Sequence, residues 1–116
     1  MNIEDFSKKY LSRLTRALER IDYNVVGEII EALEKSVADK SRIFIIGNGG
    51  SSATASHMVN DLGVGLKRRE IINFDIASLN DNAPVVSAIA NDVGYESIFS
   101  MQMKGLLSKN DIIIFL

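Results

Sequence analysis

The feature that most constrains the fold is an unbroken apolar run, Ile43–Ile46, that leads directly into a glycine-rich turn. Four residues are too few for a helix and three of them are β-branched, so the run predicts a strand buried on both faces. Gly47 ends this strand. The Asn48–Gly50 segment places little Cβ bulk in the turn, and Ser51 and Ser52 are good residues for opening a helix. The sequence therefore predicts a strand, a tight turn and a helix in succession.

Two further apolar runs predict two further strands, near Ile71–Ala77 and over Ile112–Leu116. Strands that alternate with helices and read as continuous apolar runs are typical of a parallel sheet with helices on both faces. We expect an α/β, doubly wound, flavodoxin-like sheet in which Ile43–Ile46 is the central strand.

Most of the remaining segments have apolar residues at the spacing of an α-helix. Apolar residues recur every three or four positions over 3–21 and again from 25 to about 40, which predicts two amphipathic helices, with the lysines and arginines of the first forming a solvated face. A short helix is expected over 85–90, with Pro84 in its first turn and Asp81 or Asn82 as its cap.

That short helix is expected to be broken by Asn91, Asp92 and Gly94, and the helical period resumes over 95–107. The last residue, Leu116, falls at the end of a strand, where a doubly wound fold would continue with another loop and helix. We expect a single domain over 1–116 that lacks its C-terminal half. It comprises a helical pair over 1–40 and the first part of the sheet over 42–116.

Composition excludes several kinds of function. The 116 residues are 47% hydrophobic, which suffices for a core, and the formal net charge is −2 with charges spread along the chain. We therefore expect no nucleic-acid partner and no membrane partner, and we interpret the basic run 67–69 as a solvated helix end. The absence of cysteine excludes disulfides and thiolate metal sites. With no signal peptide or long apolar stretch, the expected compartment is the cytoplasm.

The glycine-rich turn has the chemistry of an anion site. In open α/β sheets ligands bind at the carboxyl ends of strands, and a helix N-terminus offers unpaired N–H groups and a favourable dipole. A dinucleotide fingerprint would need a third glycine where Ser52 stands, and the lysine of a P-loop is absent. The turn therefore favours a phosphate over a nucleotide. The alternative, a turn needed only for chain reversal, stays open.

His57 and Asp61 follow the turn at a spacing of four, which places them on one face of a helix. Such a pair suits either a shared metal ion or a base held by its neighbour. Ser51 and His57 are separated by about 9 Å of helix rise, enough for an extended sugar phosphate to reach from the turn to the pair. The alternative reading of this lone histidine is an ordinary hydrogen-bonded residue.

Two blocks resemble a known family. The segments GNGGSSATASHMVNDL and SLNDNAPVVSAIANDVGYESIFSMQ, with the spacing between them, are similar to the sugar isomerase (SIS) fold and specifically to its sedoheptulose 7-phosphate isomerase branch. The likeness covers about 42–116, and the leading helices resemble the family's N-terminal helices. By resemblance, the substrate-binding residues are Asn48, Gly49, Gly50, Ser51, Asn91 and Asp92, with Ser51 on the phosphate.

The resemblance also implies a zinc cofactor, a homotetramer and a phosphorylated sugar as partner. His57 matches a zinc ligand, and Asp61 falls on a glutamate that is both zinc ligand and catalytic acid/base. Aspartate is one methylene shorter, so its carboxylate would stand back by more than about 1 Å, a misplacement that can cost about a hundredfold in rate. The family's arginine is replaced by Gly65, and the remaining histidine and glutamine ligands would lie beyond Leu116.

Two functions follow as expectations. The first is an aldose–ketose isomerase that converts sedoheptulose 7-phosphate to glycero-manno-heptose 7-phosphate, a precursor of cell-surface lipopolysaccharide, although 1–116 alone would be inactive. The second is a non-catalytic SIS module that binds phosphosugars or protein partners, similar to the replication-initiator-associating protein. Asp61 favours the enzyme because a pure binding module has no need of a carboxylate there.

Overall fold

The computed structural model describes residues 2–116, which divide into two compact units with the boundary between Glu31 and Ala32. Helix α1 (Ile3–Leu18) lies in the first unit, and helix α2 (Tyr23–Asp39) begins there and ends in the second. The side chain of Asn2 caps α1 by accepting hydrogen bonds from the N–H groups of Glu4 and Asp5. Both predicted leading helices are therefore present. None of the described helices combines the length and the apolar content needed to cross a membrane.

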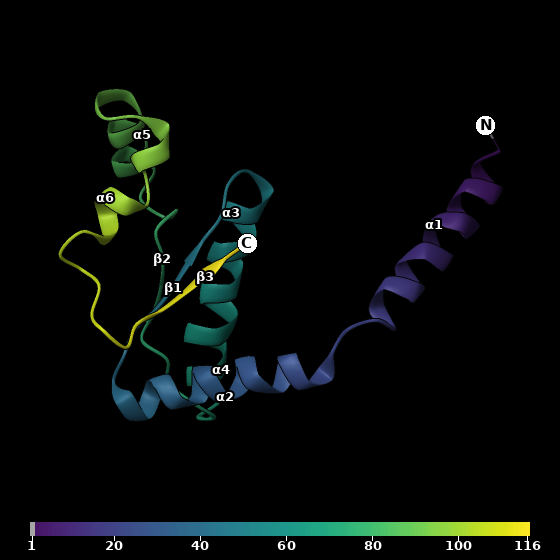
Figure 1. The fold of residues 1–116 in the computed structure, drawn as a ribbon, viewed down its shortest axis with the longest axis horizontal. Helices are drawn as coiled ribbons and strands as arrows, with labels where there is room; N and C mark the ends of the chain where they lie inside the picture. The colour runs from purple at the N-terminus through teal and green to yellow at the C-terminus, as the bar shows by residue number, and fades with distance from the viewer. Residues whose placement is uncertain (1) are drawn as a thin grey trace. The chain divides into compact units, whose positions relative to one another are not determined.

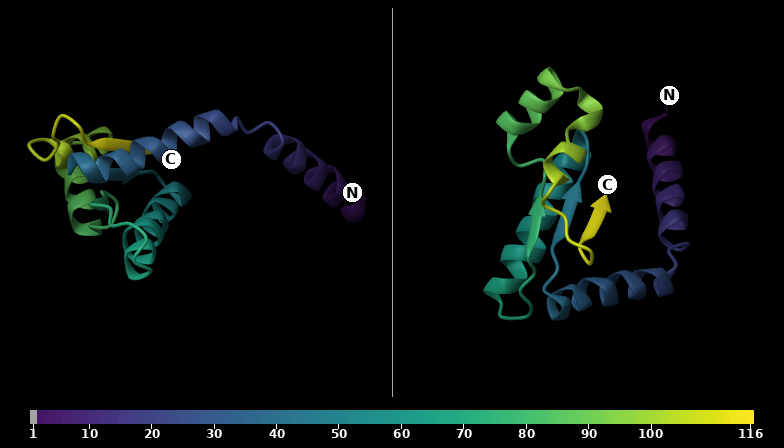
Figure 2. Two further views of the ribbon diagram at one scale, coloured as in Figure 1. Left: turned by 90° about the horizontal axis from the view of Figure 1, so that it is seen from below. Right: turned by 60° about the vertical axis from the view of Figure 1, so that its left-hand side comes forward.

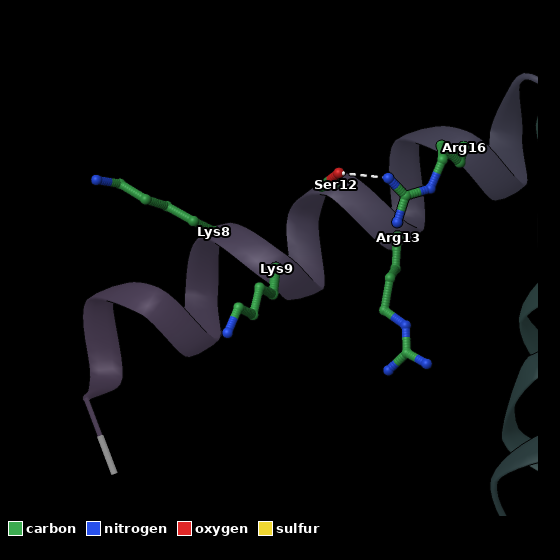
Figure 3. Close-up of a pocket in the computed structure, with 5 residues that line it drawn as sticks. All are labelled: Lys8, Lys9, Ser12, Arg13 and Arg16. Carbon is green, nitrogen blue, oxygen red and sulfur yellow. Dashed lines mark hydrogen bonds between the residues drawn. The ribbon is translucent and has the colours of Figure 1, made fainter.

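Helix α1 carries two contrasting faces. On the polar face a shallow hollow of about 480 Å³ is lined by four basic side chains and one serine: Lys8, Lys9, Ser12, Arg13 and Arg16 (Figure 3). The guanidinium of Arg16 donates to the hydroxyl of Ser12 at 3.0 Å. The apolar stripe is exposed along its whole length: Ile3, Phe6, Tyr10, Leu14 and Leu18. The lysines and arginines of α1 therefore form the solvated face that the sequence predicts.

The second unit is built on a three-stranded parallel sheet in the order β2-β1-β3, with β1 (Ile43–Ile46) in the centre. The three arrows point the same way in Figure 2. Strand β3 covers Ile112–Phe115, as predicted to within one residue, but β2 is only Ile76–Ser78. The strand predicted near Ile71–Ala77 is present but shorter, because only 76–78 pair with β1.

The residues of β1 alternate between two apolar clusters. Ile43 and Ile45, both fully buried, pack with Ala55 and Phe74 on one face of the sheet. Phe44 and Ile46 pack on the other face with Leu79, Phe99, Met103 and Ile113. Strand β1 is therefore buried on both faces, as its sequence predicts, and α3 and α6 lie on opposite sides of the sheet (Figure 1).

The remaining helices differ from the predictions: α5 (Ala83–Asp92) is longer than the helix expected over 85–90, and the others are short or irregular. The others are α3 (Gly50–Met58), a π-helix (Val59–Gly65), α4 (Leu66–Arg68), a 3₁₀-helix (Tyr95–Ser97) and α6 (Ser100–Met103). Asn82 caps α5 and Pro84 lies in its first turn, as expected. The prediction that Asn91 and Asp92 break this helix was wrong, since they are its last two residues. The continuous helix expected over 95–107 is also absent.

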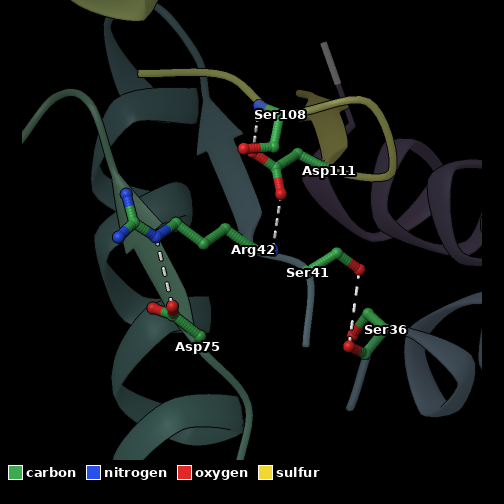
Figure 4. Close-up of polar contacts among 6 residues, drawn as sticks. All are labelled: Ser36, Ser41, Arg42, Asp75, Ser108 and Asp111. Carbon is green, nitrogen blue, oxygen red and sulfur yellow. Dashed lines mark hydrogen bonds and ion pairs between the residues drawn. The ribbon is translucent and has the colours of Figure 1, made fainter. Parts of the chain in front are cut away.

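The amino ends of the strands are tied together by polar contacts (Figure 4). One carboxylate oxygen of Asp111 accepts the backbone N–H of Arg42 at 2.8 Å, and the other accepts the N–H of Ser108 at 2.8 Å. The guanidinium of Arg42 donates to Asp75 at 3.2 Å. These contacts join the segments that lead into β1, β2 and β3. They fix the end of the sheet opposite to the glycine-rich turn.

Candidate functional site

The turn after β1 is closed by a tight approach between Gly47 and the start of α3. A Cβ atom on Gly47 would lie 2.7 Å from the Cβ of Ser51 and 2.8 Å from its carbonyl carbon, so no larger residue fits. Gly49 has φ +56° and forms the N-cap of α3, which begins at Gly50. The prediction that the serines open this helix is therefore corrected, because the cap is a glycine without a side-chain hydrogen bond.

The four N–H groups at this turn divide into two pairs. The N–H of Ser51 donates to Asn48 at 3.0 Å and that of Ser52 donates to Gly49 at 3.1 Å, so both are used within the turn. Among residues 2–116, no acceptor receives the N–H of Gly49 or Gly50. A Cβ on Gly50 would also meet nothing within 4 Å. The turn thus presents two adjacent donors beside open space, which is the arrangement an anion requires.

Neighbouring strands hold the turn through Asn80, a residue that the sequence analysis did not single out. Its amide accepts the N–H of Gly47 at 3.1 Å and donates to the carbonyl of Gly47 at 2.7 Å. Asn80 follows β2, so it lies at the carboxyl end of the strand beside β1. Its position in the polar cluster that ends the second apolar run was the available signal.

Tyr95 is a second residue that the sequence analysis missed. Its hydroxyl donates to the side-chain oxygen of Asn48 at 2.9 Å across 47 positions of sequence. Farther along α3, the hydroxyl of Ser56 donates to Asp81, the residue after Asn80. Residues from two separate segments, after β2 and after α5, therefore contact the glycine-rich turn.

His57 and Asp61 are brought together as their spacing predicts. The Nε2 atom of His57 lies 3.2 Å from a carboxylate oxygen of Asp61, although α3 ends at Met58 and a π-helix carries Asp61. The side chains are 73% and 60% exposed, so the pair faces solvent in this chain. Asp61 also lines a cavity of about 420 Å³, whose other lining residues are Asn60, Leu62, Val64, Gly65, Leu66, Arg68 and Arg69.

The π-helix packs directly against β2. A Cβ on Gly63 would lie 2.7 Å from the side chain of Ile76, so only glycine fits at this turn.

The side chains of His57 and Asp61 are both ordinary zinc ligands. No cluster of three or more histidine, aspartate or glutamate residues that could hold a metal ion occurs within 2–116. This part of the chain therefore offers two ligands.

Asn91 and Asp92 lie together at the end of α5, where the amide of Asn91 donates to the carboxylate of Asp92 at 2.7 Å. Both are exposed. Within the described residues, no hydrogen bond joins either side chain to the turn, and Tyr95 makes the only such link from this segment. The structure thus groups Asn48, Gly49, Gly50 and Ser51, pairs His57 with Asp61, and pairs Asn91 with Asp92.

Comparison with known proteins places this arrangement in a family. Residues 6–116 match the family model described as SIS domain, and the chain therefore belongs to the SIS domain family. Among named relatives, the phosphoheptose isomerase of Thermodesulfovibrio yellowstonii is 36% identical over 117 residues, which cover 98% of this chain. The phosphoheptose isomerase of Helicobacter pylori strain HPAG1 is 36% identical over 107 residues and 92% of this chain.

Two solved structures share the fold. A phosphoheptose isomerase from Francisella tularensis aligns with a TM-score of 0.85 at 18% identity, covering 99% of this chain and 61% of that one. The phosphoheptose isomerase from Neisseria gonorrhoeae aligns with a TM-score of 0.81 at 22% identity, covering 97% and 58%. These structures establish the architecture. The chain spans 58% and 53% of the lengths of the two named relatives above.

Proposed function

We propose that this chain forms the phosphate-binding part of an aldose–ketose isomerase, with sedoheptulose 7-phosphate as the substrate and glycero-manno-heptose 7-phosphate as the product. The observation that carries the proposal is the turn, which presents the unpaired N–H groups of Gly49 and Gly50 beside open space. The phosphoheptose isomerases among the relatives support the choice of sugar. A phosphate bound there would also contact Ser51, while Asn48 and the Asn91–Asp92 pair would bind the sugar.

In this proposal Asp61 is the catalytic base. Its carboxylate takes the proton from one of C1 and C2 to give an enediol and returns it to the other carbon, so no atoms are gained or lost. A proton also passes between the carbonyl and hydroxyl oxygens. The π-helix places Asp61 one turn beyond His57, and the sugar phosphate would lie along α3 with its phosphate at the turn. This geometry separates the binding of the phosphate from the chemistry.

We further propose that His57 and Asp61 contribute two ligands to a zinc site. Tetrahedral zinc with ordinary bond lengths sets its donor atoms roughly 3.3 Å apart, and the two atoms lie 3.2 Å apart here. The nitrogen and carboxylate donors therefore fit one ion. Zinc, when bound, supplies Lewis acidity toward the carbonyl oxygen of the sugar. In the chain itself, His57 also holds the Asp61 carboxylate in place.

The exposure of the His57–Asp61 pair favours a second candidate, a non-catalytic module that binds phosphosugars or a protein partner. A base that works on C–H bonds needs a site closed to water, and the two side chains are 73% and 60% exposed in this chain. In this alternative the glycine-rich turn keeps its ligand while Asp61 has no chemical role. The two candidates therefore make the same prediction for binding and opposite predictions for proton transfer.

We also propose that the protein is a homo-oligomer, with four copies in the assembly. The apolar stripe of α1 lies exposed, from Ile3 at 73% to Leu14 at 45%. An exposed stripe of this length marks a protein contact. A second copy of the same helix is the simplest partner, since closed symmetry pairs identical surfaces.

The deciding experiment uses the full-length protein and an Asp61→Asn substitution. The variant should bind sedoheptulose 7-phosphate with unchanged affinity, because the turn is untouched, and should lose the exchange of deuterium from C1-labelled or C2-labelled substrate. Asp61→Glu tests the reach of the side chain, and Glu70→Gln removes an exposed carboxylate beyond α4 as a control. If Asp61→Asn exchanges deuterium as fast as the parent, the binding module is the better account.

A further inference from the structure

The hydrogen bond between Tyr95 and Asn48 joins the glycine-rich turn to the segment after α5. The tyrosine hydroxyl donates to the Oδ1 atom of Asn48 at 2.9 Å. Tyr95 is 57% exposed, so its ring is not a core residue and packing alone does not account for its position. The contact therefore directs attention to what the hydroxyl does for Asn48.

The backbone around Tyr95 is built to hold this contact. Gly94 has φ +135°, a conformation that side chains rarely adopt, and its N–H donates to Ile89 at 3.0 Å where α5 ends. Ile98 is 3% exposed and anchors the following residues in the core. The amide of Gln102 donates to the carbonyls of Ile98 and Leu79. The 3₁₀-helix that carries Tyr95 is thus fixed at both ends.

The direction of the hydrogen bond sets the chemistry of Asn48. A carboxamide has one acceptor atom and two N–H donors on a second atom. With Oδ1 bound to the tyrosine hydroxyl, the two N–H donors on Nδ2 remain available for another partner. Among residues 2–116, no acceptor receives the Nδ2 group of Asn48. The side chain therefore offers hydrogen-bond donors beside the turn, and it would bind an oxygen atom of a ligand.

We infer that Tyr95 is a positioning residue, which holds Asn48 so that its Nδ2 group donates to an oxygen of the sugar part of a phosphosugar. This inference rests on the proposed function, since it assumes that the turn binds the phosphate. Asn48 then recognises the sugar and the N–H groups of Gly49 and Gly50 recognise the phosphate. Tyr95 acts on the ligand through Asn48 and takes no part in proton transfer.

A structural role makes a different prediction from a positioning role. If Tyr95 only stabilises the turn, its loss disturbs the whole turn, and the affinities for inorganic phosphate and for a sugar phosphate fall together. If Tyr95 positions Asn48, only the contact to the sugar is weakened. One hydrogen bond to a ligand corresponds to about a 3- to 10-fold change in dissociation constant.

The test measures the binding of sedoheptulose 7-phosphate and of inorganic phosphate to the full-length protein by calorimetry. Tyr95→Phe should raise the dissociation constant for the sugar phosphate about 3- to 10-fold and leave that for phosphate unchanged. In an Asn48→Ala background the same substitution should have no further effect. Tyr23→Phe is the control, because Tyr23 is 77% exposed and its hydroxyl has no hydrogen-bond partner within 2–116. Equal weakening of both ligands, or an unchanged effect without Asn48, overturns the inference.

A second measurement separates this inference from the proposed function. The side-chain amide resonances of Asn48 in a ¹⁵N spectrum report the Tyr95 contact without any ligand. Tyr95→Phe should shift them and Tyr23→Phe should not. If the parent protein fails to bind sedoheptulose 7-phosphate while these resonances shift, the proposed function fails and the contact stands. If the resonances do not respond to Tyr95→Phe, the positioning role itself is refuted.

Discussion

The carboxylate of Asp111 binds the backbone N–H of Arg42 at 2.8 Å, although the two residues are 69 positions apart. The contact joins the residue before β1 to the residue before β3. The hydrogen bond from the N–H of Arg42 lowers the pKa of Asp111 below its ordinary value of 3.8, and the N–H of Ser108 and the charge of Arg42 act in the same direction. The ionised side chain of Asp111 therefore joins β1 to β3 at the amino end of the sheet.

Low pH should weaken the hydrogen bonds to the Asp111 carboxylate. A carboxyl group whose pKa is lower in the folded state stabilises the fold fully above its ordinary pKa, and that contribution is lost as the pH falls toward the folded pKa. We expect Asp111→Ala to lower the free energy of unfolding at neutral pH by about 1–2 kcal/mol through the loss of two hydrogen bonds. Below about pH 4 the difference from the parent should shrink. Urea unfolding across this range checks it, with the exposed Glu34→Ala as control. A difference independent of pH would contradict the prediction.

Gly47 and Gly50 should respond oppositely to the same substitution. Gly47→Ala should destabilise the fold by about 1–3 kcal/mol, because the new methyl group would meet Ser51. Gly50→Ala should leave the unfolding midpoint unchanged or raise it, since its Cβ would point into open space. Thermal unfolding of the two variants compares them directly. Equal destabilisation by both would show that the close approach at Gly47 is not the cause.

A bulkier side chain at Gly50 tests the anion site. Gly50→Val should abolish phosphosugar binding in the full-length protein, because the branched side chain would occupy the space beside the two unpaired N–H groups. The helical circular dichroism signal should stay the same. Binding of sedoheptulose 7-phosphate by calorimetry is the readout. Undiminished affinity in this variant would remove the main support for a phosphate site.

Zinc binding should depend on both His57 and Asp61. His57→Ala or Asp61→Ala should weaken zinc binding by more than about tenfold, since even groups that only support a ligand are worth that much. The zinc content of the dialysed full-length protein, measured by mass spectrometry, is independent of activity. Glu70→Gln should keep the content of the parent. A zinc content that neither alanine variant lowers would place the metal site elsewhere or nowhere in the protein.

Substitutions at two adjacent residues of α1 should show which of its two faces takes part in assembly. Leu14→Glu places a charge in the exposed apolar stripe and should yield a smaller species, whereas Arg13→Glu alters the basic face and should not. Light scattering at micromolar concentration gives the mass of each variant. A well-folded monomeric parent, or dissociation by Arg13→Glu alone, would count against assembly through the stripe.

The sheet was predictable because each of its strands is indicated by a short apolar run in the sequence. Ile43–Ile46 is predicted to the residue, since a run of four apolar residues, three of them β-branched, is too short for a helix and favours a strand. The strand expected from Ile71 is limited to 76–78, because β1 offers pairing partners only there. An apolar run shows the tendency to form a strand, whereas the neighbouring strand sets its length.

The candidate site was predictable in part for a similar reason. The turn and the His57–Asp61 pair follow from residues close in sequence, and the structure keeps the pair together although a π-helix interrupts α3. The contacts of Asn80 and Tyr95 span 33 and 47 positions, and no local pattern records them. The 95–107 segment has helical spacing, but Gly105 at φ +78° lies within it and only short helices form.

The paired contact between Asn80 and Gly47 makes the turn sensitive to chemical ageing. Asparagine amides are among the thermolabile groups of proteins. Loss of ammonia from Asn80 would leave a carboxylate where an amide donates to the carbonyl of Gly47 at 2.7 Å. Two oxygen atoms would then repel each other at the point where the turn leaves β1. An old molecule would thus keep the bond from the N–H of Gly47 and lose the bond to its carbonyl, which leaves the turn with one contact to Asn80 in place of two.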